Sequence, residues 1–144
     1  IRWDKKGNKQ IKTNLLKGIS KITQIKTGSK TAEMVKYMTN TYLATKVSFA
    51  NEIYQICEKL NIDYDKVVEY STLDERLGYS HWSVPGPDED FGFGGHCFPK
   101  DLQALISVAD ELDLDVDVLR SAKYTNDKVR KNRDWERMKG RAVV

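Results

Sequence analysis

The stretch TAEMVKYMTNTYLATKVSFANEIYQICEKL, residues 31–60, decides the fold because it predicts one long helix. It contains no Gly or Pro, and its large apolar side chains recur every three, four or seven residues, as in an amphipathic helix. They are Val35, Met38, Tyr42, Phe49, Ile53, Ile56 and Leu60. Smaller apolar residues widen this pattern beyond one stripe, which favours packing on two sides. The helix would be about 45 Å long, enough for a spine or a dimer seam.

Shorter helices are expected after this long one. Asp63 can cap a second helix through Val67–Tyr70. Helical spacing returns over residues 102–112 and again from Asp117 to about Asp134. The fold class is therefore mainly α.

Residues 1–30 show little helical periodicity. The element they suggest is a short strand near Thr23–Thr27. A lone strand needs a partner, so we expect this one to pair outside the chain. If the strand pairs outside the chain, the chain is part of a larger protein.

Composition excludes several classes of protein. The length of 144 residues suits one domain. No run approaches the roughly 20 apolar residues of a membrane span, and the N-terminus lacks the apolar core of a signal peptide. Two cysteines are too few for a disulfide framework, which favours a reducing, cytoplasmic setting. Cys57 lies among the apolar residues of the helix and is expected in the core.

Charge is distributed unevenly along the chain. Residues 1–30 hold nine basic residues (Lys or Arg) and one acidic residue (Asp or Glu). Residues 31–122 hold seven basic and seventeen acidic residues, and residues 123–144 hold eight basic and three acidic residues. Basic ends could contact nucleic acid. Residues 5–30 hold no aromatic residue for stacking on bases. We therefore expect no nucleic-acid partner and keep nucleic-acid binding only as a minor alternative.

The segment GFGGHCFPKD, residues 92–101, carries the chemistry. Its glycines allow close approach of the backbone to a ligand, and Pro99 suits the first turn of a helix. Cys97 would precede that helix, where the dipole and Lys100 favour a thiolate, with the carboxylate of Asp101 one turn on. These residues suit a nucleophilic cysteine with an acid–base partner. A structural cysteine in a glycine-rich turn fits them equally well.

Two other readings of this segment are disfavoured. Cys97, His96 and His81 lack the paired spacing of zinc ligands, so no metal site is predicted. Adjacent residues seldom face each other, which argues against a Cys–His dyad of Cys97 with His96.

The string GFGGHCFPKD closely resembles the catalytic-cysteine signature of the UDP-glucose/GDP-mannose dehydrogenase family. Residues 31–53 of the long helix look like the start of that family's central domain, and DERLG, residues 74–78, resembles its turn motif. The three motifs occur in order within residues 28–134. Residues 80–95 resemble the longer loop of bacterial UDP-glucose 6-dehydrogenases in this family.

The resemblance implies a fold and a division of the chain. Residues 30–134 would form the central helical domain, which carries the catalytic cysteine and dimerises through its long helix. Residues 1–29 would be a remnant, with one strand, of an α/β Rossmann dinucleotide-binding domain, and residues 135–144 a C-terminal tail. A homodimer is expected.

The resemblance also implies an activity, the NAD-dependent oxidation of UDP-glucose to UDP-glucuronate in two hydride transfers. Cys97 would attack the aldehyde to give a thiohemiacetal and then a thioester. Asp101 would help activate the hydrolytic water, Lys100 would lie near the cofactor NAD, and Gly94 would pack against the sugar nucleotide.

Three further residues match positions of the family. Lys36 and Asn40 match its Lys-x-x-x-Asn pair, and their spacing places both on one helical face. There they could stabilise a developing oxyanion and contact the substrate. Arg76 matches an arginine that reaches the substrate of the neighbouring subunit, and a guanidinium suits a diphosphate or a sugar hydroxyl.

Departures from the family leave alternatives open. The sequence has no G-x-G-x-x-G turn, so this chain alone is expected to be inactive. His96 replaces the commoner Ser or Thr, and the loop Pro85–Asp90 is an insertion without an assigned role. A non-catalytic dimerisation module, or a dehydrogenase for GDP-mannose or a UDP-N-acetylhexosamine, remains possible.

Overall fold

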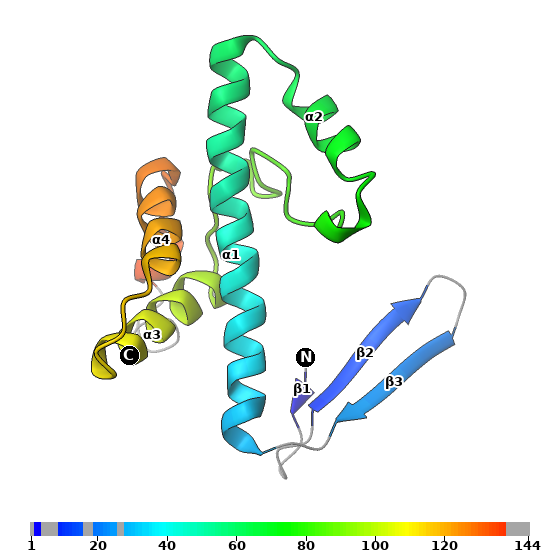
Figure 1. Ribbon diagram of the computed structural model, residues 1–144, viewed down its shortest axis with the longest axis vertical. Helices are drawn as coiled ribbons and strands as arrows, with labels where there is room; N and C mark the ends of the chain where they lie inside the picture. The colour runs from blue at the N-terminus through cyan, green and yellow to red at the C-terminus, as the bar shows by residue number, and fades with distance from the viewer. Residues whose placement is uncertain (1, 4–8, 16–18, 26–27, 138–144) are drawn as a thin grey trace. The chain divides into compact units, whose positions relative to one another are not determined.

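The computed structural model describes residues 2–3, 9–15, 19–25 and 28–137, and the side chains of residues 28–137 (Figure 1). The chain divides into two compact units, Ile1–Met38 and Thr39–Val144. Each unit is described separately below. The domain boundaries expected at residues 29/30 and 134/135 stay predictions.

The first unit contains a three-stranded antiparallel sheet in the order β1-β2-β3. Its strands are β1 (Arg2–Trp3), β2 (Lys9–Leu15) and β3 (Ile19–Ile25). Lys9 lies opposite Ile25, and Leu15 lies opposite Ile19.

The strand expected near residues 23–27 corresponds to β3, although residues 26 and 27 lie outside the described residues. The expectation that it pairs outside the chain is wrong, because β2 is its partner. The assignment of this segment to a dinucleotide-binding domain stays a prediction.

The long helix is confirmed as α1 (Ser29–Leu60), with 32 residues. The second helix is confirmed as α2 (Tyr64–Ser71), and the carboxylate of Asp63 accepts a hydrogen bond from the Lys66 N–H at 3.2 Å. A short 3-10 helix, η1 (Glu75–Leu77), follows within the DERLG turn.

Two more helices complete the second unit, α3 (Cys97–Glu111) and α4 (Asp117–Val129). The last helix is shorter than expected, because the backbone at Arg130 turns extended, with ψ near 127°. Asp134–Arg137 then form the 3-10 helix η2, where a loose tail was expected from residue 135. Residues 138–144 lie outside the described residues.

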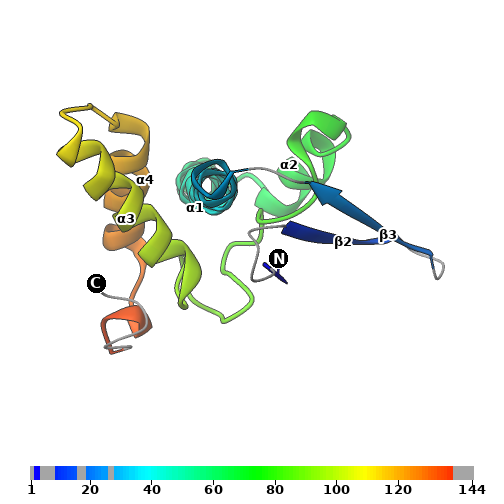
Figure 2. The same ribbon diagram turned by 90° about the horizontal axis from the view of Figure 1, so that it is seen from below.

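Within the second unit, α1 packs on two sides, as expected. Figure 2 shows α3 and α4 on one side of α1 and α2 on the other. One core joins α1 to α3 and α4, and the other joins α1 to α2 and the loop before Phe91. The completely buried Ala44 and Ala50 allow close approach on these two sides. Cys57 lies in the second core, which confirms its structural role.

The large apolar stripe of α1 does not face these cores. Within the second unit, Tyr42, Phe49, Ile56 and Leu60 are exposed, and Ile53 packs partly against the core. The first three lie at intervals of seven residues, the spacing of a helix–helix seam. No helix among the described residues is long and apolar enough to cross a membrane.

Candidate active site

Cys97 is a free, exposed cysteine at the first residue of α3. Helix N-termini present unpaired N–H groups and a positive partial charge, so its thiol lies where a negative charge is stabilised. Pro99 lies in the first turn of α3, as expected. His96 occupies the N-cap position, is exposed, and makes no side-chain capping hydrogen bond there within the described structure.

Asp101 is completely buried one turn after Cys97. One of its carboxylate oxygens pairs with the Lys100 ammonium at 2.6 Å. The other accepts a hydrogen bond from the Asn40 side-chain amide of α1 at 2.5 Å. The structure thus brings Asn40 of the long helix together with Lys100 and Asp101 of the cysteine motif.

Lys36 lies one helical turn before Asn40 on α1. Its side chain is half-buried, and its ammonium lies 5.4 Å from the centre of the Tyr37 ring. The spacing of four residues places Lys36 and Asn40 on the same face of this helix.

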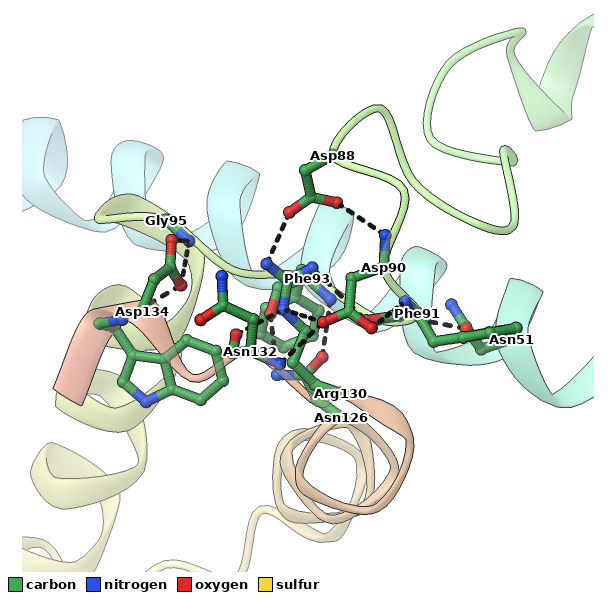
Figure 3. A network of polar contacts seen from close by, with 12 residues as sticks. Asn51, Asp88, Asp90, Phe91, Phe93, Gly95, Asn126, Arg130, Asn132 and Asp134 are labelled. Carbon is green, nitrogen blue, oxygen red and sulfur yellow. Dashed lines mark hydrogen bonds and ion pairs between the residues drawn. The ribbon is translucent and has the colours of Figure 1, made fainter. Parts of the chain in front are cut away.

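The main chain before Cys97 is bound by side chains from distant parts of the sequence (Figure 3). The Gly92 N–H donates to the Asn51 side chain at 3.1 Å, and the Phe93 N–H donates to the Asn126 side chain at 2.7 Å. The Gly95 N–H donates to both carboxylate oxygens of Asp134 at 3.0 Å. Three N–H groups of this glycine-rich segment are therefore occupied by the protein's own side chains.

Two of the glycines are required by close packing within the chain. At Gly92, where φ is +67°, a Cβ atom would overlap the Asn126 side-chain oxygen and lie 3.2 Å from Val129. At Gly94 a Cβ atom would overlap the guanidinium of Arg130 and lie 2.8 Å from the Asp134 carboxylate. The absence of side chains at these glycines makes room for side chains of residues 126–134. The sequence pattern predicts instead that the glycines let the backbone approach a ligand.

Arg130 connects this loop to the end of α4, and its side chain is only 1% exposed. It donates to the Asp88 carboxylate at 2.6 Å and to the Asn132 carbonyl at 2.9 Å, and its Nε lies 3.6 Å from the Asp90 carboxylate. Burial opposes the charge of Arg130, but the hydrogen bond and charge of Asp88, together with the charges of Asp90 and Asp134, outweigh it and raise the pKa of the guanidinium. The loop Pro85–Asp90, which had no assigned role, thus supplies the two carboxylates that hold a buried arginine.

Sequence reasoning missed four residues of this network, Asn51, Asn126, Arg130 and Asp134. Asn51 carried a usable signal, because an amide in the apolar set of a buried helix needs a hydrogen-bonding partner. Arg130 and Asp134 carried none, since they lie in a charged segment that looks like ordinary surface.

The DERLG turn holds Arg76 at the surface. Its side chain is 88% exposed and forms an ion pair with Asp74 at 2.5 Å. The buried Lys46 ammonium donates to the carbonyls of Leu77 and Gly78, at 2.7 and 3.2 Å, and lies 4.4 Å from the centre of a Trp82 ring. Burial lowers the pKa of Lys46. The turn is therefore anchored while the Arg76 guanidinium stays accessible.

A cavity of about 490 Å³ opens beside the loop. Its lining includes Gly94, Arg130, Phe98, His81 and Asp88. The rings of His81 and Phe98 lie 5.7 Å apart, and burial, with a smaller contribution from Lys46, lowers the pKa of His81. The cavity has the size of a small-molecule site.

The described residues do not form a dinucleotide cradle. Such a cradle uses backbone N–H groups at a glycine-rich turn that follows a strand. Here the N–H groups of Gly92, Phe93 and Gly95 bind side chains of the protein. Lys100 is the residue that could contact a cofactor, and it pairs with Asp101. The described residues also contain no cluster of three His, Cys, Asp or Glu that could hold a metal ion.

Residues 30–128 match the model of the UDP-glucose/GDP-mannose dehydrogenase family, central domain. The chain belongs to this family. The matched segment contains the long helix, the DERLG turn and the cysteine loop. The expected family and the mainly α central domain are thus confirmed.

Individual relatives agree with this membership. The chain is 41% identical over 106 residues to UDP-glucose 6-dehydrogenase TuaD of Bacillus subtilis, covering 74% of this chain and 22% of TuaD. It is 38% identical over 96 residues to a UDP-glucose 6-dehydrogenase of Rickettsia prowazekii, and the match covers 67% of this chain and 21% of that protein.

A solved structure of a UDP-glucose dehydrogenase from the archaeon Pyrobaculum islandicum is also similar. It superposes with a TM-score of 0.63 at 36% identity and covers 69% of this chain and 22% of that one. The chain spans about a fifth of the length of these family members.

Proposed function

We propose that this chain supplies the catalytic-cysteine centre of an NAD-dependent dehydrogenase that oxidises UDP-glucose to UDP-glucuronate. The observation that carries the proposal is the exposed Cys97 at the start of α3, one turn from a buried Asp101 that Asn40 and Lys100 hold. The UDP-glucose 6-dehydrogenases that match over this segment support the choice of substrate.

In the proposed reaction, a first hydride transfer oxidises the primary alcohol of the sugar to an aldehyde. The Cys97 sulfur then bonds to the aldehyde carbon, and the aldehyde oxygen takes up a proton, which gives a thiohemiacetal. An exposed thiol at a helix N-terminus suits this role, because the local dipole stabilises the thiolate that attacks. A second hydride transfer oxidises the thiohemiacetal to a thioester, which water cleaves to the carboxylate and the free thiol of Cys97.

Lys36 and Asn40 would stabilise the negative oxygen that develops at the reacting carbon. They lie one turn apart on α1, and the Asn40 amide lies against the Asp101 carboxylate. A lysine ammonium and an amide N–H are suitable donors for such an oxygen. Lys36 and Asn40 would also orient the substrate.

Asp101 and Lys100 would act on the hydrolytic water and beside the cofactor, respectively. The Lys100 ammonium and the Asn40 amide stabilise the ionised form of Asp101. A carboxylate in that form can accept a proton from water. NAD, when bound, would accept the hydride, and no residue described in this chain holds its diphosphate.

Gly94 and Arg76 would contact the sugar nucleotide. Gly94 lines the cavity beside the loop, and Arg76 presents its guanidinium to solvent. Arg76 would reach the substrate of a second copy, since we infer that α1 pairs with α1 of that copy. The exposed stripe Tyr42, Phe49 and Ile56 supports a homodimer.

A chimera tests the activity. Residues 30–128 of this chain replace the matching segment of TuaD, and reduced NAD is measured with UDP-glucose as substrate. We expect the chimera to be active, Cys97→Ser to abolish UDP-glucuronate formation, and the matched Cys57→Ser to retain it. Undiminished UDP-glucuronate formation by Cys97→Ser would exclude Cys97 as the nucleophile.

Thiol chemistry tests the nucleophile separately. Iodoacetamide alkylation of the 144-residue chain at neutral pH should modify Cys97 much faster than Cys57 or free glutathione. Equal rates for Cys97 and glutathione would favour a non-catalytic dimerisation module. A chimera that oxidises GDP-mannose or a UDP-N-acetylhexosamine in preference to UDP-glucose would change the substrate assignment.

A further inference from the structure

The short segment between the loop and Cys97 is anchored from the end of α4. Asp134 binds the Gly95 N–H with both carboxylate oxygens, two residues before Cys97. Arg130 fills the space where Gly94 has no side chain, three residues before Cys97. The position of the thiol therefore depends on a segment more than 30 residues later in the chain.

The guanidinium of Arg130 contacts several parts of this region at once. It bonds to the Asp88 carboxylate at 2.6 Å and to the Phe91 carbonyl at 3.5 Å on the loop, and to the Asn132 carbonyl at 2.9 Å on its own segment. Asp90, whose carboxylate lies 3.6 Å from Arg130, also accepts the Asn132 N–H at 2.8 Å. The loop and the segment that follows α4 are thus joined through the guanidinium of Arg130 and the carboxylates of Asp88 and Asp90 (Figure 3).

This geometry requires an arginine. The rigid fork of a guanidinium donates in several fixed directions, whereas the ammonium of lysine is one compact charge on a flexible stem. A lysine at position 130 could keep the ion pair with Asp88 but not the packing against Gly94 and the bond to Asn132 together.

We propose that Arg130 is a positioning residue for Cys97, which it holds at the start of α3 through its packing against Gly94 and its bonds to Asp88 and the Phe91 carbonyl, with Asp134 as the second anchor. The proposal rests on the proposed function, because the orientation of the thiol matters only if Cys97 reacts. Loss of the Arg130 guanidinium should let residues 92–96 shift. The Cys97 thiol would then move away from the N–H groups in the first turn of α3. The chain would still fold around its two cores.

The test measures the alkylation of Cys97 by iodoacetamide in the full 144-residue chain, in a Cys57→Ser background that leaves one thiol. The quantity compared is the rate constant at about pH 7 divided by that at about pH 9.5. This ratio reports the charge state of the thiol and cancels differences in accessibility. Arg130→Lys is the variant. The matched control is Arg120→Lys, which alters an exposed ion pair between Arg120 of α4 and Asp110 of α3.

We expect the ratio to fall at least about threefold in Arg130→Lys, the size of a helix-terminus effect on a charge, and to stay constant in Arg120→Lys. An unchanged ratio in a folded Arg130→Lys chain would overturn the proposal. If Arg130→Lys fails to fold, Asp88→Ala removes a half-exposed partner of Arg130 and should lower the ratio in the same direction. An unchanged ratio in that variant would overturn the proposal as well.

The same measurement separates failure of this proposal from failure of the proposed function. If the unaltered chain has the same ratio as glutathione, the nucleophile assignment fails. If the ratio is higher for the unaltered chain than for glutathione, and is the same for Arg130→Lys as for the unaltered chain, only the positioning role fails.

Discussion

The side-chain amide of Asn40 donates a hydrogen bond to the buried carboxylate of Asp101, at 2.5 Å, across 61 positions of the sequence. This bond joins the two motifs that carry the family resemblance, the long helix α1 and the cysteine loop with its helix α3. A buried carboxylate is stable only when its oxygens are bound, and Lys100 occupies the other one. The bond therefore fixes α3 against α1 as well as placing two proposed catalytic residues side by side.

Asn40→Ala should destabilise the fold. It would leave one oxygen of the buried Asp101 without this donor, at a cost of about 1–3 kcal/mol in the free energy of unfolding. Urea unfolding followed by circular dichroism measures the change. Gln103→Ala, on the exposed face of α3, is the control and should cost less than about 0.5 kcal/mol. Equal stability of Asn40→Ala and the unaltered chain would contradict the assigned bond.

Gly94→Ala should also destabilise the fold. The added methyl group would overlap the buried guanidinium of Arg130, and displacement of either group should cost about 1–3 kcal/mol. Gly28→Ala is the matched control, because no atom of the described residues lies within 4 Å of a Cβ atom there. The same urea unfolding measures both variants, and a Gly94→Ala chain as stable as Gly28→Ala would show that Arg130 does not fill this space.

Acid should weaken the loop through Asp88 and Asp90. The hydrogen bond from Arg130 lowers the pKa of Asp88, and the backbone N–H of Asn132 lowers the pKa of Asp90, both below 3.8. A lowered pKa in the folded state stabilises the fold above the unfolded pKa, and the stabilisation is lost as the pH falls through the folded value. The free energy of unfolding should therefore decrease between about pH 5 and about pH 2.

Asp88→Asn isolates one part of that acid effect. Its free energy of unfolding should fall less steeply over the same pH range, by a modest amount because Asp88 is half-exposed. The measurement is urea unfolding at a series of pH values. Identical slopes for Asp88→Asn and the unaltered chain would show that the ion pair with Arg130 contributes no pH-dependent stability.

Ile56→Glu should weaken the proposed homodimer. A carboxylate in an apolar seam between two helices loses hydration, and we expect the dissociation constant to rise at least about tenfold, or about 1.4 kcal/mol. Sedimentation velocity over a range of concentrations measures it. Tyr124→Glu, at another exposed position with a large apolar side chain, on α4, is the control and should leave the dimer intact. A chain that is monomeric at micromolar concentration would contradict the pairing.

Local sequence patterns predicted most of the helices and the cysteine motif. The spacing of apolar residues between 31 and 60 predicted α1, Asp63 marked the start of α2, and the string GFGGHCFPKD pointed to Cys97, Lys100 and Asp101. These features depend on residues within a few turns of one another, so one sequence is enough to find them. The end of α4 was placed too late: the backbone turns extended at Arg130, whose side chain bonds to Asp88, 42 positions earlier in the sequence.

The sequence alone predicted most of the helices, the family and the position of the cysteine motif. The tertiary structure decided what the glycines of the loop are for and which side chains bind the main chain before Cys97. Asn51, Asn126, Arg130 and Asp134 reach the loop across 33 to 42 positions. The reason is physical, because buried N–H groups and a buried guanidinium need oxygen partners. Packing, and not sequence proximity, selects which residues supply them.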